Sequence, residues 1–100
     1  MRILDFAVSG QNIEKQGDFS GIVKGTKGYL RARFTFDSEW NSCKKVAVFE
    51  KNLKDYPAPL VGNECEIPEE SLTWNHFYVR VVGEKDGKRI TTRKVKVEQS

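Results

Sequence analysis

The sequence has few of the residues that catalytic and metal sites require. Among its 100 residues there are one histidine, two cysteines and one methionine. Around the single histidine, His76, no spacing supports a Ser-His-Asp or Cys-His arrangement, and a zinc site would lack ligands. Two cysteines do not make the disulfide framework of a small secreted domain. We therefore expect a non-enzymatic protein without cofactor or metal, in which Cys43 and Cys65 remain reduced because no export signal is visible.

Long apolar runs and a strong charge imbalance are also missing. No run approaches the roughly 18 apolar residues of a membrane-spanning helix, and Asp5 interrupts the start of the chain, unlike a signal peptide. Seventeen basic and 14 acidic residues leave a net charge of +3, which is small for a dedicated nucleic-acid binder. The 38% of apolar residues suffice for one modest core, so residues 1–100 are expected to form a single domain.

Helical periodicity is scarce, whereas alternation with period two is common. In residues 29–37 every second residue is apolar, namely Leu30, Ala32, Phe34 and Phe36. Successive side chains of a strand point to opposite faces, so these residues face a core and their neighbours face water. The same alternation recurs in residues 4–8 and 77–81. The predicted core comprises Phe6, Leu30, Phe34, Phe36, Val48, Phe77, Val79 and Val81.

The turn signals favour an all-β fold. Asp86-Gly87 suits a tight hairpin because glycine tolerates positive φ, and residues 68–72 suit one helical turn with Pro68 at its start. In residues 89–98, Ile90 and Val95 differ in parity, so one flat strand cannot bury both; an extra residue near 92–94 would switch the face. The pattern predicts an antiparallel β-sandwich of about seven strands with at most one short helical turn, and a small barrel is the alternative.

Several phrases between Tyr29 and Val97 occur in a characteristic order. They are Arg33–Trp40, Lys45–Phe49, Asn63–Leu72 with the pattern C-x-I-P-x-E-x-L, Phe77–Gly83 followed by Asp86-Gly87, and Arg89–Thr92. Together they resemble the small immunoglobulin-like β-sandwich domain of tail, baseplate and receptor-binding proteins from phages and prophages of Gram-positive bacteria. In that comparison Trp40 would cap one end of the core, and Pro68 would start a turn that brings Leu72 back onto it.

The resemblance implies a non-catalytic structural protein of the virion tail or baseplate, which is assembled in the bacterial cytoplasm and acts by binding other virion proteins. The last strand is then the expected docking edge, because unpaired strand edges invite strand addition. Its candidate partner-binding residues are Arg89, Arg93 and Lys96. Neither nucleic acid nor a membrane is an expected partner.

Two other functions remain as alternatives. A carbohydrate-binding module for the host cell surface would use Tyr29, Trp74 and Tyr78 as stacking surfaces. A nucleic-acid platform would use the same kind of exposed aromatic and basic side chains, but nearby acidic residues dilute the basic cluster of the last strands.

Overall fold

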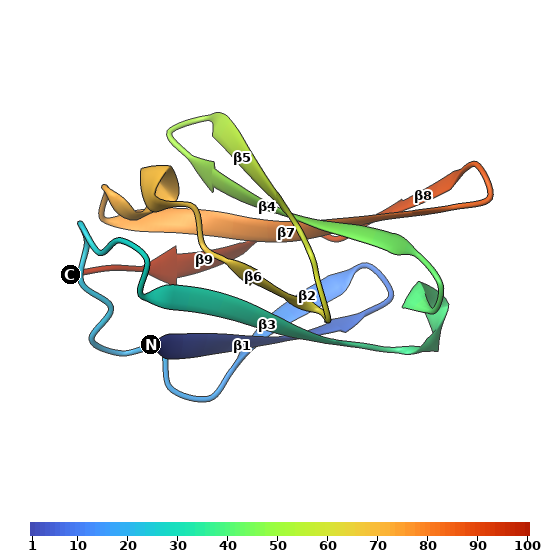
Figure 1. The fold of residues 1–100 in the computed structure, drawn as a ribbon, viewed down its shortest axis with the longest axis horizontal. Helices are drawn as coiled ribbons and strands as arrows, with labels where there is room; N and C mark the ends of the chain where they lie inside the picture. The colour runs from blue at the N-terminus through green and yellow to red at the C-terminus, as the bar shows by residue number, and fades with distance from the viewer.

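The period-two segments form nine strands in two sheets, in a computed structural model that describes all 100 residues (Figure 1). One sheet, called sheet A, has the order β2-β1-β3-β6; the other, sheet B, has the order β5-β4-β7, with β8 and β9 both paired to β7. Sheet A contains β1 (Arg2–Ser9), β2 (Asn12–Gln16), β3 (Leu30–Phe36) and β6 (Glu64–Glu66). Sheet B contains β4 (Lys44–Lys51), β5 (Lys54–Pro59), β7 (His76–Lys85), β8 (Lys88–Thr91) and β9 (Val95–Glu98).

The architecture confirms an all-β protein built from two sheets and excludes the closed barrel. Two finer expectations are wrong. The sheets are not wholly antiparallel, because β1 and β3 run parallel from Arg2 opposite Leu30 to Val8 opposite Phe36. The reason is that β2 has already returned the chain to the end at which β1 begins, with Gln16 opposite Asp5, and the connection of residues 17–29 then crosses to the other side of β1 at that same end. There are also two short 3₁₀ turns rather than at most one, η1 (Ser38–Trp40) and η2 (Glu69–Leu72).

The core lies between the sheets and follows the predicted alternation. All the predicted core residues are buried except Phe36, which is half-buried at the edge of the cluster. The rings of Phe6 and Phe34 stack at a centroid distance of 5.2 Å across the parallel pair. Val48 is 8% exposed but has the opposite parity to Ala47 and Phe49, which are completely buried. Val48 therefore lies on the outer face of sheet B, and it is Ala47 and Phe49 that supply the core from β4.

The predicted bulge separates β8 from β9. Val82 pairs with Thr91 and Val79 pairs with Val95, so residues 92–94 lie opposite residues 80–81 of β7. Thr92 fills the break: its N–H donates to the Val81 carbonyl, and its Oγ1 accepts from the Val81 N–H, both at 3.0 Å. The extra residue changes the facing of the strand, which explains how both segments contribute apolar side chains to one core.

The ends of the molecule differ in character. Both chain termini lie at one end, and the β7–β8 hairpin projects from the other (Figure 1). The hairpin turns at Asp86 and Gly87 with φ values of 52° and 76°, as the Asp-Gly signal predicts. At its base Trp40 is completely buried and donates from Nε1 to the Gly10 carbonyl at 2.9 Å. Trp40 thus caps the core, and completely buried Leu72 after Pro68 also matches its predicted role.

Candidate functional site

The residues that most often act as nucleophiles, acids, bases or metal ligands lie on different elements of the structure. His76 begins β7, Cys65 lies in the core on β6, and Glu69 and Glu70 begin η2. No group of three or more histidine, cysteine or acidic side chains could hold a metal ion. Burial raises the pKa of the Cys65 thiol to about 12, against a smaller opposing effect of Arg31. A thiol with that pKa stays protonated and is a poor nucleophile at neutral pH.

No helix in the structure is both long and apolar enough to cross a membrane.

The two sides of the sandwich differ in how their strand edges are protected. On one side, β5 carries Pro57 and Pro59, which have no N–H to offer, and β6 has only three residues. Prolines and very short strands are established ways of blocking an edge against further pairing. On the other side lie β2 and the β8–β9 segment, without proline. This second side, formed by β2, β8 and β9, is called the open side below.

Two backbone bridges divide the open side. Near the bulge, Gln11 accepts at its carbonyl from the Arg93 N–H at 3.0 Å and donates from Nε2 to the Thr91 carbonyl at 3.1 Å. At the end of the chain, the Ser100 N–H donates to the Ile22 carbonyl at 2.8 Å. These contacts enclose β9 from both ends. By contrast, residues 88–90 of β8 lie beyond the first bridge, on the projecting hairpin, and are the freest part of the edge (Figure 1).

The three predicted partner-binding residues lie along this edge, but in different settings. Arg89 pairs with Glu84 through an Nη2–Oε1 contact of 2.6 Å, and Lys96 lies 3.6 Å from a Glu98 oxygen. Arg93, in the bulge, makes no ion pair and is exposed. The structure therefore places all three on the open side, with Arg89 on the free hairpin and Lys96 inside the enclosed stretch.

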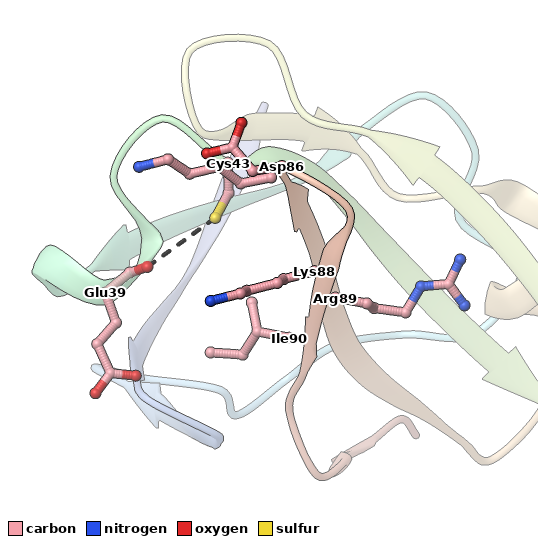
Figure 2. Close-up of a pocket in the computed structure, with 7 residues that line it drawn as sticks. Glu39, Cys43, Asp86, Lys88, Arg89 and Ile90 are labelled. Atoms are coloured by element: carbon pink, nitrogen blue, oxygen red, sulfur yellow. Dashed lines mark hydrogen bonds between the residues drawn. The ribbon is translucent and has the colours of Figure 1, made fainter.

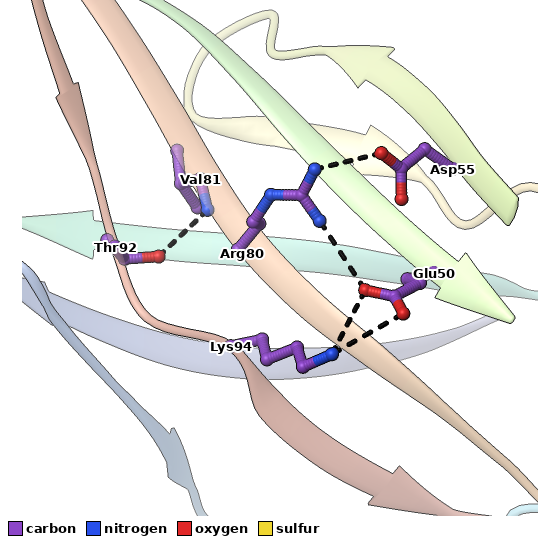
Figure 3. A network of polar contacts seen from close by, with 6 residues as sticks. All are labelled: Glu50, Asp55, Arg80, Val81, Thr92 and Lys94. Atoms are coloured by element: carbon purple, nitrogen blue, oxygen red, sulfur yellow. Dashed lines mark hydrogen bonds and ion pairs between the residues drawn. The ribbon is translucent and has the colours of Figure 1, made fainter. Parts of the chain in front are cut away.

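A chain of ion pairs crosses the outer face of sheet B (Figure 3). Arg80 on β7 donates from Nη2 to Asp55 at 2.9 Å and lies 3.6 Å from Glu50 through Nη1. Lys94 in the bulge approaches Glu50 at 3.3 Å. The side chain of Glu50 is only 13% exposed, so its charge is compensated from two directions. These contacts connect β4, β5, β7 and the bulge across the outer face of sheet B.

An aromatic row continues this face toward the start of β7. The Trp74 and His76 rings stack with centroids 5.7 Å apart, and His76 meets Tyr78 edge to face at 5.5 Å. Tyr29 does not join them, because it directly precedes β3 in sheet A and so belongs to the other layer. Of the three candidate stacking residues, the structure brings Trp74 and Tyr78 together in this row and leaves Tyr29 in the other layer.

The aromatic row borders a hollow of about 320 Å³ that the sequence did not predict as a unit. The turn between β4 and β5 closes its other side with Asn52 and Leu53, and Glu50 and Lys94 complete the lining. His76, around which the sequence supported neither a catalytic arrangement nor a zinc site, is the middle ring of this row. The spacing Trp74-x-His76-x-Tyr78 is the signal that could have revealed the row, since alternate residues of a strand share a face.

A second hollow, of about 500 Å³, lies at the base of the projecting hairpin (Figure 2). Figure 2 shows Glu39, Cys43, Lys88 and Ile90 around it, whereas the side chain of Arg89 points away. The Cys43 Sγ contacts the Glu39 carbonyl at 4.0 Å. Its lining mixes acidic and basic groups and contains no deeply buried polar side chain, so it defines no particular ligand.

No protein-family model matches the chain, and neither a curated protein nor a solved structure matches it.

Proposed function

We propose that this protein is a non-catalytic, immunoglobulin-like module of a phage or prophage tail or baseplate, and that it binds another virion protein through its open side. The phage assignment rests on the ordered phrases between Tyr29 and Val97, which resemble those of the Gram-positive phage domain. The two-sheet fold is compatible with it. The observation that carries the binding mode is the contrast between a side blocked by two prolines and an open side ending in a free hairpin strand.

The geometry of the hairpin identifies the backbone groups available for strand addition. Lys85 and Lys88 flank the two-residue turn, and such a turn closes on a pair that exchanges both backbone hydrogen bonds. Because hydrogen-bonded and non-hydrogen-bonded pairs alternate along an antiparallel ladder, the next pair, Glu84 with Arg89, is non-hydrogen-bonded. The N–H and C=O of Arg89 therefore point away from β7, where a partner strand would bind.

The charges of the open side favour an acidic partner. Arg93 has no internal ion pair, and Lys85 and Lys88 on the hairpin contact no carboxylate within ion-pair distance. Basic side chains on an edge strand keep a free module soluble, and they steer a complementary partner toward it. The proposed partner thus presents an extended segment with acidic side chains.

The experiment measures binding of the purified protein to purified tail and baseplate proteins encoded beside its gene. Arg89→Pro removes the outward N–H without removing a bond to β7, whereas Arg89→Thr removes the same charge and keeps that N–H. If strand addition operates, Arg89→Pro abolishes binding and Arg89→Thr weakens it only by about the amount expected for one rim charge. Equal binding by both variants would exclude strand addition at β8.

Charge reversal tests the same surface without touching the backbone. Arg93→Glu together with Lys96→Glu should weaken binding by about tenfold while the thermal unfolding transition stays in place. The matched control reverses Lys27 and Lys54, two exposed lysines outside the open side, and should leave binding unchanged. DNA binding at physiological salt, with affinity falling steeply as salt rises and with no protein partner, would overturn the structural function.

A further inference from the structure

The hollow beside Trp74 has the form of a small-ligand site and is separate from the open hairpin. It lies on the outer face of sheet B, between the start of β7 and the turn that joins β4 to β5. Its lining combines the rings of Trp74, His76 and Tyr78 with the hydrogen-bonding groups of Glu50, Asn52 and Lys94. Sites of this kind, a few polar groups around an apolar platform, are typical of small-molecule recognition.

The Trp74 ring is presented as a platform. It stacks on His76 at an interplanar angle of 23°, and yet 44% of the residue remains exposed, so the ring offers a surface toward the hollow. Its backbone is held in place, because the Gln99 Nε2 donates to the Trp74 carbonyl at 2.9 Å. The preceding Thr73 hydroxyl accepts from the Lys51 Nζ at 2.9 Å. An aromatic side chain anchored in this way loses little conformational entropy when a ligand stacks on it.

The charges around the hollow are already compensated within the protein. Glu50 is paired with Arg80 and with Lys94, and the Lys94 ammonium lies 4.6 Å from the centre of the Tyr78 ring. A cationic ligand would have to displace Lys94 from that ring, and an anionic one would meet the Glu50 carboxylate. A ligand can therefore use the exposed face of Trp74. It can also use polar atoms that are neutral or that belong to groups whose charge is already compensated by an ion pair.

From this geometry we infer that the hollow binds one pyranose ring of a neutral oligosaccharide or polysaccharide. A pyranose has an apolar face of C–H groups, which stacks on an aromatic ring, and a rim of hydroxyl groups that both donate and accept hydrogen bonds. The Trp74 ring would take the C–H face. The Asn52 amide and the Glu50 carboxylate would take hydroxyl groups at the rim, because an amide offers both donors and an acceptor and a carboxylate offers acceptors.

This inference does not depend on the proposed binding of a virion protein. The two surfaces adjoin at the bulge, where Arg93 belongs to the open side and Lys94 lines the hollow, but strand addition is tested at Arg89 and sugar binding at Trp74 and Asn52, which lie on different segments. A failure of sugar binding would leave the strand-addition proposal intact, and failure of the latter would leave the sugar site intact.

Two soluble neutral probes, chitohexaose and cellohexaose, test the site by titration into ¹⁵N-labelled protein. We expect saturable chemical-shift changes for at least one of them, at the Trp74 indole N–H and at the amides of Asn52 and His76. The Trp40 indole, which is completely buried, should not shift and serves as an internal reference. Polygalacturonate is the anionic comparison and should bind more weakly than the neutral probe.

Variants then separate the platform from general surface effects. Trp74→Ala should weaken binding of the neutral probe by about tenfold or more, which calorimetry can measure, and Trp74→Phe should recover part of it by retaining a flat ring. Asn52→Gly should also weaken binding, and it keeps the turn because the φ of Asn52 is 52°, a conformation that glycine adopts readily. The matched control is Tyr29→Ala, which removes an equally exposed aromatic residue from the other sheet and should have no effect.

Three results would overturn the inference. The first is the absence of saturable binding by both neutral probes. The second is binding that Trp74→Ala and Asn52→Gly leave unchanged, or that Tyr29→Ala reduces. The third is preferential binding of polygalacturonate that disappears with added salt, which would identify a nonspecific cationic surface.

Discussion

The Trp40 ring lies directly against the backbone of Gly83. A Cβ at position 83 would be 2.7 Å from Cζ3 of Trp40, a separation that real Cβ atoms essentially never show. Gly83 is part of β7 at the base of the projecting hairpin, and the ring of Trp40 is tied to the Gly10 carbonyl by its indole N–H. This one contact therefore links the cap of the core to the strand that carries the proposed docking edge.

Gly83→Ala should lower the free energy of unfolding by about 1–3 kcal/mol, the usual cost of forcing an extra methyl group into a packed core. Backbone strain contributes nothing here, because Gly83 is not among the glycines with positive φ. Urea denaturation measures the change. In a Trp40→Leu background the same substitution should cost less, since the ring that causes the clash is gone. Equal costs in the two backgrounds would show that the ring is not responsible.

Phe34→Ala should lower the free energy of unfolding by about 3–5 kcal/mol, because it empties a buried aromatic site. Phe34 is 2% exposed and stacks on Phe6 across the parallel strands. The neighbouring Thr35 faces water, so Thr35→Ala is the matched control and should change stability by less than about 0.5 kcal/mol. A loss below about 0.5 kcal/mol for Phe34→Ala would contradict the facing of β3.

Thr92→Val should lower the free energy of unfolding by about 1–3 kcal/mol despite its nearly identical shape. The substitution removes the Oγ1 that accepts from the Val81 N–H, and so leaves that buried donor without a partner (Figure 3). Thr91→Val is the control, because Thr91 is half-buried and its hydroxyl makes no hydrogen bond within the protein. If both variants were equally stable, the hydroxyl would have no role in holding the bulge.

The two cysteines should differ sharply in reactivity. In the native protein at pH 8, a disulfide reagent such as Ellman's reagent should react rapidly with Cys43, which is half-buried, and not with Cys65, which is buried with a pKa of about 12. In denaturant both should react. Fast reaction of both thiols in the native state would contradict the burial of Cys65.

The raised pKa of Cys65 also predicts a dependence of stability on pH. Above the ordinary thiol value of 9.0 the unfolded chain loses this proton while the folded protein keeps it, so the unfolded state gains stability as pH rises. The contribution is fully present below pH 9 and declines toward pH 12. The free energy of unfolding should therefore fall more steeply with pH in this range for the wild type than for Cys65→Ala.

Much of the local structure follows from short-range patterns in the sequence. The alternation of Leu30, Ala32 and Phe34 determines which face of β3 is buried, because a strand has only two faces. Asp86-Gly87 specifies the tight hairpin through its positive φ angles. Even the bulge is encoded locally, since the parity of Ile90 and Val95 can be reconciled with one core only by an extra residue.

Other features depend on residues that are distant in the sequence, and only the tertiary structure decided them. The parallel pairing of β1 with β3 depends on the path of a long connection, which carries no periodic signal. The alternation within 46–49 is hidden because every residue is apolar, so register with β7 decided that Ala47 and Phe49 face inward.

The candidate sites show the same division. The sequence by itself indicated that Arg89 and Lys96 lie on the last strands and Arg93 at the break between them, because this concerns neighbours along one segment of the chain. Only the folded structure decided that Tyr29 lies in the other sheet, that Gln11 bridges the edge at Arg93, and that Glu50, Asn52 and Lys94 meet the aromatic row. These contacts join separate strands and turns, and their geometry is set by sheet register and packing rather than by any local pattern.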